Sequence, residues 1–236
     1  MTERFLPITH VLTKWIIGMP LRYLFFRAEV VGLDNIPEKG GAIIVSNHLS
    51  NLDPGLIGTT VKRRIRFMAK QELFVFPLGQ LLKLHGDFPV RRLERDTAAV
   101  RKAQQVVLDG DVLGMFPEGT RSKTGSMNRA HPGTALIALR TGAPIVPAGI
   151  TGTEKIQNLQ TILFRRPKAR VVYGEPFYLE RTERLRSADV EEATTAIMKK
   201  VAELLPESYR GVYGEPESPG EAERPLDPAI AAPPKE

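Results

Sequence analysis

The first residues that could carry chemistry are a histidine and an aspartate in one short segment. His48 and Asp53 stand in the sequence SNHLSNLDP, residues 46–54, directly after an apolar run. Imidazole can take a proton from an alcohol near neutral pH, and a carboxylate on its second nitrogen fixes the tautomer and stabilises the imidazolium. The pair therefore predicts a general base with its orienting group. A simpler alternative is that Asp53 caps a helix that has Pro54 at its first position.

A second segment, FPEGTRS at residues 116–122, suits the binding of a phosphate. Gly119 permits close approach of the backbone, and Arg121 offers a two-pronged donor to phosphate oxygens. Glu118 could hold that guanidinium or a substrate hydroxyl, and Thr120 adds a hydroxyl of its own. The alternative is a surface turn with a local Glu-Arg pair.

Two further segments have less specific meanings when taken singly. The segment GDFPVRR, residues 86–92, brings basic side chains to the end of a predicted strand and could bind an anion. The segment APIVPAGI, residues 143–150, contains Pro147 and predicts a core or edge strand. An apolar wall of this kind also suits a hydrocarbon chain.

The order of these segments is more specific than any one of them. His-x4-Asp, Gly-x-Phe-Pro-Val-x-Arg, Phe-Pro-Glu-Gly-Thr-Arg and Ile-Val-Pro-Ala-Gly-Ile resemble the blocks of the glycerolipid acyltransferase family, which includes 1-acylglycerol-3-phosphate acyltransferase, over residues 32–175. The resemblance implies that His48 is the general base and Asp53 its partner. It implies that Pro147 lines the acyl side. It also implies an acceptor-phosphate site made by Arg92, Glu118, Gly119, Thr120 and Arg121.

The second block departs from the family pattern. It usually reads Gly-x-Ile-Phe-Val-x-Arg, whereas Phe88 and Pro89 replace the Ile-Phe pair in this chain. Arg92 keeps the position of the family's arginine. The change alters the local apolar surface, so it bears on donor or acceptor preference more than on the chemistry.

The reaction implied by the resemblance is a direct acyl transfer. The chain has no cysteine and no Gly-x-Ser-x-Gly segment, so neither a thiol nor a serine at a nucleophile elbow is available. His48 would deprotonate a lysophospholipid hydroxyl, which attacks the thioester of acyl-CoA or acyl carrier protein. No cofactor is expected beyond that donor. The histidines are scattered and no glycine-rich nucleotide motif occurs, so neither a metal nor a nucleotide is predicted.

Charge favours an anionic partner. The 236-residue chain has a formal net charge of +6, although acidic residues outnumber basic ones by six to two over residues 215–236. Basic runs at residues 62–66 and 165–170 predict either solvated faces or contact with lipid headgroups. We expect a membrane lipid surface rather than nucleic acid. The alternatives are a different lysolipid or lipid-linked acceptor, and a non-catalytic protein that binds anionic lipid or nucleic acid.

The N-terminal segment, residues 1–30, predicts helices that associate with a membrane. Apolar residues cover most of a helix over residues 7–19, and Pro20 breaks or kinks it. Lys14, Arg22 and Arg27 interrupt the apolar stretch, so it falls short of a bilayer span. The segment predicts either a hairpin in the lipid interface or packing against the core. We expect a peripheral or monotopic protein on the cytoplasmic face of the cell membrane.

The motifs require a scaffold that brings strand ends together. Alternating apolar runs and helical patterns predict an α/β fold, a mixed sheet flanked by helices, in an acyltransferase domain over residues 31–205. We expect a disordered tail over residues 206–236. The predicted strands are Ala42–Ser46, Ile65–Ala69, Phe88–Arg92, Val112–Phe116, Ile145–Ile150 and Arg170–Tyr173. The predicted helices are Glu72–Leu84, Thr97–Leu108, Gly133–Arg140 and Asp189–Leu204.

Overall fold

Seven strands form one mixed sheet in the part of the chain that the structure describes. The computed structural model describes residues 27–91, 96–155, 168–180 and 185–214. The strand order is β1-β7-β6-β2-β5-β3-β4. Neighbouring strands run parallel except for β6 and β7, which are antiparallel. The strands are β1 (Arg27–Val31), β2 (Ala42–Ser46), β3 (Ile65–Lys70), β4 (Phe88–Val90), β5 (Val112–Met115), β6 (Ile145–Thr151) and β7 (Lys168–Tyr173). The predicted α/β fold with a mixed sheet is confirmed.

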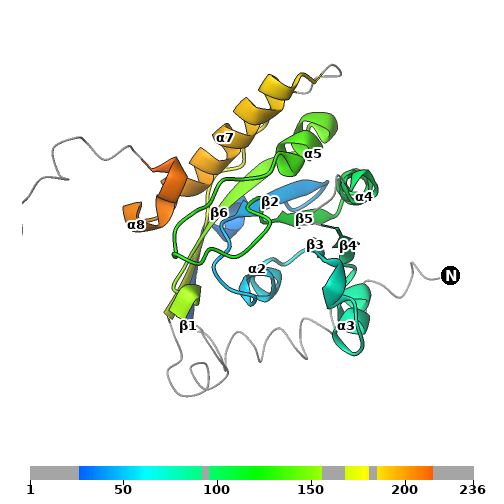
Figure 1. Cartoon of the computed structure of the whole chain (residues 1–236), viewed down its shortest axis with the longest axis horizontal. Helices are drawn as coiled ribbons and strands as arrows, with labels where there is room; N and C mark the ends of the chain where they lie inside the picture. The colour runs from blue at the N-terminus through cyan, green and yellow to red at the C-terminus, as the bar shows by residue number, and fades with distance from the viewer. Residues whose placement is uncertain (1–26, 92–95, 156–167, 181–184, 215–236) are drawn as a thin grey trace, which may run out of the picture.

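Helices cover both faces of this sheet (Figure 1). In the described residues they are α2 (Asp53–Thr60), α3 (Leu78–His85), α4 (Thr97–Leu108), α5 (Gly133–Thr141), α7 (Ser187–Glu203) and α8 (Glu207–Arg210). Short 3-10 turns occur at η3 (Leu33–Asn35), η4 (Gln71–Leu73), η5 (Thr153–Lys155) and η6 (Gly211–Tyr213). Among these helices, none is long and apolar enough to cross a bilayer.

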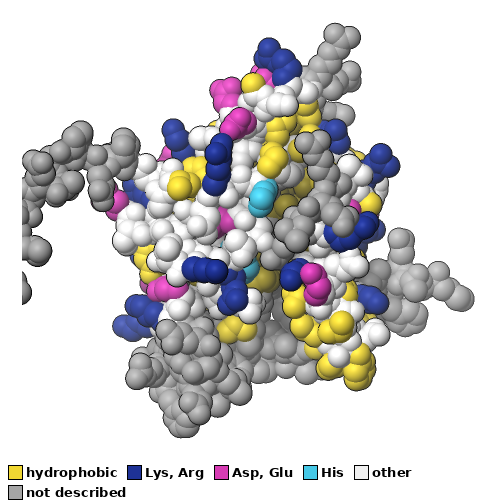
Figure 2. Space-filling view, in the orientation of Figure 1, with side chains coloured by type: hydrophobic (Ala, Val, Ile, Leu, Met, Phe, Trp, Pro, Cys, Tyr) yellow, Lys and Arg dark blue, Asp and Glu magenta, His cyan; other side chains and the backbone are white. Residues whose placement is uncertain are grey.

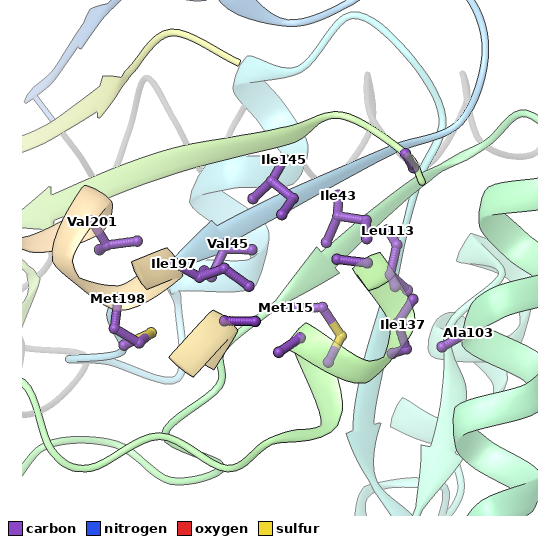
Figure 3. Packing of buried hydrophobic residues seen from close by; sticks show 14 of the residues in the cluster. Ile43, Val45, Ala103, Leu113, Met115, Ile137, Ile145, Ile197, Met198 and Val201 are labelled. Carbon is purple, nitrogen blue, oxygen red and sulfur yellow. The ribbon is translucent and has the colours of Figure 1, made fainter. Parts of the chain in front are cut away.

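The central strand β2 divides the hydrophobic core into two layers. All five of its residues are buried, as expected for a parallel strand covered on both faces. Ile43 and Val45 point to the layer packed by α4, α5 and α7 (Figure 3), and Ile44 points to the layer packed by α2. The two layers fix the strand, and therefore the position of the loop that follows its carboxyl end.

The helix predicted at residues 72–84 is shorter in the structure. Residues 71–73 form the turn η4, and α3 begins only at Leu78. Pro77 explains the late start, because a proline disfavours helical backbone in the residue before it. Strand β4 ends at Val90, whereas the sequence predicted a strand to residue 92. Arg92 lies outside the described residues.

Ordered structure also extends past both predicted domain boundaries. The strand β1 starts at Arg27 and pairs with β7, whereas the sequence placed the start of the domain at residue 31. After Leu205, where the sequence predicted disorder, α8 and η6 pack against the core through Tyr209 and Tyr213. The expectation of disorder is therefore wrong for residues 207–213. Residues 1–26 and 215–236, with the predicted helix and most of the tail, lie outside the described residues.

The basic run at residues 62–66 is largely used within the fold. Arg63 donates hydrogen bonds to the carbonyl oxygens of Pro37 and Gly110, each 2.6 Å, and of Gly40. Arg66 forms an ion pair of 2.8 Å with Asp111. These arginines connect loops on one edge of the sheet, so they do not form the exposed basic face considered from the sequence. Lys62 in the same run is exposed.

Candidate active site

His48 and Asp53 lie in one loop between β2 and α2. The Nδ1 atom of His48 is 2.9 Å from Oδ2 of Asp53. The same carboxylate oxygen accepts hydrogen bonds of 2.7 Å from the backbone N–H groups of Leu49 and Ser50. The carboxylate is thus turned back onto its own loop. It does not cap the helix, since Leu52 occupies the N-cap position and Asp53 is the first helical residue.

This geometry fixes the tautomer of the histidine. An ionised carboxylate can only accept hydrogen bonds, so Nδ1 of His48 must carry the proton that it shares with Asp53. The other ring nitrogen, Nε2, is then the basic atom of the neutral imidazole. Asp53 is fully buried and His48 is nearly so. A buried, oriented imidazole of this kind can accept a proton from a hydroxyl that enters beside it.

Contacts from the loop that follows β5 hold the ring and the backbone of His48. The ring of Phe116 stacks on the imidazole at a centroid distance of 4.3 Å and an angle of 28°. The carbonyl oxygen of His48 accepts a hydrogen bond of 2.7 Å from the backbone N–H of Ser122. Because β2 and β5 are neighbours, the loops at their carboxyl ends meet at one edge of the sheet. The segments at residues 46–54 and 116–122 therefore meet in the structure.

The side chain of Glu118 supports the loop that contains His48. Its Oε1 accepts a 3.0 Å hydrogen bond from the backbone N–H of His48. Its Oε2 accepts hydrogen bonds from the backbone N–H (2.8 Å) and the Nδ2 group (3.0 Å) of Asn128. The side chain is 2% exposed, and this burial raises the pKa of the Glu118 carboxyl against the opposing effect of its hydrogen bonds. Both oxygens face protein donors, whereas the sequence suggested an arginine or a substrate.

The loop after Glu118 turns sharply at a glycine. Gly119 has φ of +66°, and a Cβ atom there would lie 2.9 Å from Cδ2 of His131. The backbone N–H of His131 donates a 2.8 Å hydrogen bond to the carbonyl oxygen of Pro117. The left-handed backbone favours glycine here, and any Cβ atom would also displace the ring of His131. Nothing in the motif spacing pointed to His131, which only the fold brings to this loop.

A large cavity opens beside His48. Its volume is about 1420 Å³, and Gly119, Thr120, Arg121 and His131 also line it. Hydrophobic side chains from strand β3, from helices α3 and α5 and from the loops between them form much of the wall. Figure 2 shows hydrophobic surface and a histidine in the hollowed region of this face. The described lining residues also include five cationic side chains: Lys70, Arg91, Arg101, Arg121 and Arg140. The cavity can therefore hold a molecule that combines an anionic group with an apolar chain.

Of the predicted substrate-binding residues that the structure describes, Glu118 and Pro147 do not line this cavity. Arg92 lies outside the described residues, although its neighbour Arg91 lines the cavity. Pro147 is buried in β6, where its carbonyl oxygen accepts a 2.9 Å hydrogen bond from the backbone N–H of Gly174. It is absent from the described lining of the cavity. Pro147 thus lies in the sheet, whereas the resemblance implied that it lines the site of the acyl chain.

Asn47 is a supporting residue that the sequence reasoning missed. Its Nδ2 group donates a 2.9 Å hydrogen bond to the carbonyl oxygen of Ile150, and its Oδ1 accepts one of 2.8 Å from the N–H of Ile150. The amide therefore acts like one more backbone pair between β2 and β6. Its position directly before His48 was the only available signal. Over the described ranges, no group of three or more His, Asp or Glu side chains is placed to hold a metal ion.

Comparison with known proteins gives agreeing results from sequence and structure. A family model described as Acyltransferase matches residues 27–151. The 1-acyl-sn-glycerol-3-phosphate acyltransferase of Bacillus subtilis (strain 168) is 29% identical over 180 residues, 75% of this chain and 87% of the relative. The chloroplastic 1-acyl-sn-glycerol-3-phosphate acyltransferase BAT2 of Brassica napus is 30% identical over 161 residues, 66% of this chain. The chain spans only 46% of the length of that plant protein.

A solved structure is similar over most of the fold. The crystal structure of the 1-acyl-sn-glycerophosphate (LPA) acyltransferase PlsC from Thermotoga maritima superposes with a TM-score of 0.66 and 25% sequence identity. The match covers 86% of this chain and 83% of the solved chain. The similarity therefore includes parts of the fold beyond the segment matched by the family model.

Proposed function

The chain belongs to the acyltransferase family, and we propose that it transfers a fatty acyl group from acyl-CoA or acyl carrier protein to the sn-2 hydroxyl of lysophosphatidic acid. The product would be phosphatidic acid, a precursor of phospholipids. The names of the relatives from Bacillus subtilis and Brassica napus support this acceptor. The observation that carries the proposal is the 2.9 Å contact between Asp53 and His48, which lines a cavity with apolar and cationic side chains.

The proposed reaction begins at Nε2 of His48. This atom takes the proton of the acceptor hydroxyl while the oxygen attacks the thioester carbonyl carbon. The negative charge of Asp53 stabilises the imidazolium that forms. When the tetrahedral intermediate collapses, the carbon–sulfur bond breaks and the thiolate leaves with the proton from His48. The donor becomes a free thiol, the acceptor becomes an ester, and the imidazole returns to its neutral form.

Binding of the acceptor phosphate is assigned to the loop that contains Arg121. An arginine can donate two parallel hydrogen bonds to a phosphate group. Gly119 and Thr120 line the same cavity, to which Thr120 can offer a hydroxyl. Holding the phosphate there would bring the hydroxyl to His48 and convert a bimolecular encounter into a positioned reaction. Arg92, from the second block, is proposed to contribute to the same phosphate site.

The protein is proposed to work on the cytoplasmic face of the cell membrane, as a peripheral or monotopic protein. Both the acceptor and the product are lipids, so an enzyme at the surface can take its substrate without full extraction into water. The positive net charge of +6 favours an anionic lipid surface.

The proposal is tested by acceptor-dependent thiol release. Purified protein in lipid micelles is mixed with a long-chain acyl-CoA, lysophosphatidic acid is added, and the rate is compared with that of His48→Ala. We expect release that depends on the acceptor and is lost in the variant. The assay is repeated with acyl carrier protein as donor and with other lysolipids as acceptors. The proposal would be contradicted if no thiol were released with either donor, or if His48→Ala released as much thiol as the wild type.

A further inference from the structure

Hydrophobic side chains gather on one exposed segment of the fold. The α3 tip, defined here as residues 73–84, contains six of the ten large hydrophobic side chains that are exposed within the described residues. They are Leu73 (42% exposed), Val75 (63%), Phe76 (86%), Leu78 (44%), Leu81 (40%) and Leu84 (49%). Figure 2 shows a cluster of hydrophobic side chains over α3. Scattered exposed leucines are ordinary, but a contiguous cluster marks an interaction surface.

The α3 tip is a fixed part of the fold. Gly79 is buried, and a Cβ atom at this position would lie 2.4 Å from the carbonyl carbon of Phe74. The backbone N–H of Gly79 donates a 2.6 Å hydrogen bond to the carbonyl oxygen of Val75. The N–H of Gln80 donates one of 3.1 Å to Pro77. These contacts fix the turn before α3, in which Val75 and Phe76 are exposed. Figure 1 shows α3 at the outer edge of the molecule.

The α3 tip is continuous with the cavity that contains His48. Leu73, Leu78 and Leu81 are exposed on the outside and also line the cavity. An apolar path therefore runs from the outer surface of the segment to the proposed base. A hydrocarbon chain can follow this path without contact with water. A soluble protein partner would not need such a path.

Charge around the α3 tip indicates the kind of partner. Lys70 and Lys83 are exposed beside the apolar side chains, with Glu72 as the neighbouring acid. The cavity behind the tip is lined by five cations against the carboxylates of Asp87 and Asp96. A second copy of this chain, which carries a net charge of +6, would bring like charge to the contact. An anionic lipid surface meets both the charge and the apolar side chains.

We infer that the α3 tip inserts into the interface of a lipid bilayer, with Phe76 deepest and the mouth of the cavity held at the surface. This inference rests on the proposed function, because a lipid acceptor explains why the cavity should open against a membrane. Aromatic and leucine side chains enter the boundary between headgroups and acyl chains, while lysines remain among the headgroups.

The absence of cysteine from the sequence makes a direct test available. Phe76→Cys in the full chain carries an environment-sensitive fluorophore, and Leu108→Cys, at a leucine that is 67% exposed on α4, is the matched control. Each is mixed with vesicles of phosphatidylcholine and phosphatidylglycerol, with or without a nitroxide on the lipid acyl chains. We expect a blue shift and nitroxide quenching at position 76 and neither at position 108.

If something other than a bilayer covers the α3 tip, the fluorescence results will differ. If residues 1–26 or a second copy cover the α3 tip, the fluorophore at position 76 is shielded from iodide before vesicles are added, and vesicles change little. An unshifted fluorophore on protein that sediments with the vesicles also overturns the inference. An equal shift at position 108 would show non-specific adsorption and overturn it as well.

An activity measurement separates this inference from the proposed function. Phe76→Glu should reduce vesicle binding by about tenfold or more, because a buried phenyl group contributes roughly 1.5–3 kcal/mol. The turnover of vesicle-embedded lysophosphatidic acid should fall with it. The turnover of a short-chain, water-soluble acceptor should stay unchanged, since Phe76 does not line the cavity. A wild-type protein inactive on both acceptors would refute the proposed function, while the fluorophore result would still decide the inference.

Discussion

The backbone N–H of His48 is bound to the side chain of Glu118 at 3.0 Å, across a separation of 70 positions in the sequence. The carboxylate also binds two groups of Asn128, so one buried side chain connects three segments at the edge of the sheet. Backbone groups in a loop usually bind water. The position of His48, the proposed base, therefore depends on Glu118, which takes no part in the proposed reaction.

Replacing Glu118 with alanine should destabilise the fold and remove activity. The N–H groups of His48 and Asn128 would lose their acceptor, and each buried unsatisfied donor costs about 1–3 kcal/mol. We expect the urea-unfolding free energy to fall by at least roughly 2 kcal/mol. Glu118→Gln keeps one acceptor oxygen and is the control, for which a smaller loss is expected. Equal, small losses in both variants would contradict a supporting role.

The stability of the protein should depend on the titration of Glu118. Burial raises the pKa of this carboxyl, so the folded chain binds the proton more tightly than the unfolded chain. This contribution is fully present below the unfolded pKa of about 4.3 and is lost as the pH rises through the higher folded pKa. The unfolding free energy of wild type, relative to Glu118→Gln, should therefore decrease with rising pH in that window and then level off. Urea unfolding at several pH values measures the difference.

Asp53→Asn should separate the charge of Asp53 from its hydrogen bonds. An amide oxygen at the place of Oδ2 can still accept from His48, Leu49 and Ser50, so the fold and the tautomer should be kept. The negative charge that stabilises the imidazolium is lost. We expect kcat to fall by about 10²-fold or more with little change in KM for the acceptor. A rise in KM at unchanged kcat would assign Asp53 to binding instead.

Arg121→Gln should weaken binding of the acceptor through its phosphate. A hydrogen bond to a charged group contributes about 1.5–3 kcal/mol, so KM for lysophosphatidic acid should rise by roughly tenfold to a hundredfold. A monoacylglycerol, which has no phosphate, should show no such rise if it is turned over. Lys123→Gln is the control, because Lys123 is an exposed cation in the same loop that does not line the cavity. The same change in both variants would point to long-range electrostatics.

Gly119→Ala should distort the loop that contains Arg121. The left-handed backbone costs an alanine about 1–2 kcal/mol, and its Cβ atom would meet the ring of His131 at 2.9 Å. We expect a lower melting temperature and a higher KM for the acceptor. Adding His131→Ala removes the contact but not the backbone strain, so the double variant should recover only part of the stability. Complete recovery would mean that the contact alone requires glycine.

The elements that were predicted well are those with local signals. Strand β2 is an uninterrupted apolar run that is buried on both faces, and α4 begins after Asp96, whose side chain accepts the N–H of Ala99. The strand β1 was missed because it is a short edge strand that contains Arg27 and Glu29. Its partner β7 lies far along the chain, and nothing local specifies such a pairing.

The difference between local and distant contacts also explains which contacts of the site could be predicted from the sequence. His48 and Asp53 meet within one loop, so their spacing was enough to suggest the pair. The contacts of Glu118 and Asn47 join residues 70 and 103 positions apart, and only the order of the strands decides them. The acyltransferase family was predicted from the four sequence blocks and is confirmed by the family match. The blocks name residues but do not say which of them face the cavity, as Pro147 illustrates.

The short helix α8 is hydrogen-bonded to the loop that supports His48, the proposed base. The carbonyl oxygen of Tyr209 accepts a 2.8 Å hydrogen bond from the N–H of Met127. The next residue, Asn128, binds Glu118, which in turn binds His48. A ribosome makes His48 early and Tyr209 late, and an emerging chain can adopt only the contacts whose partners already exist. The proposed base therefore acquires its final surroundings only after the last helix of the described chain has left the ribosome.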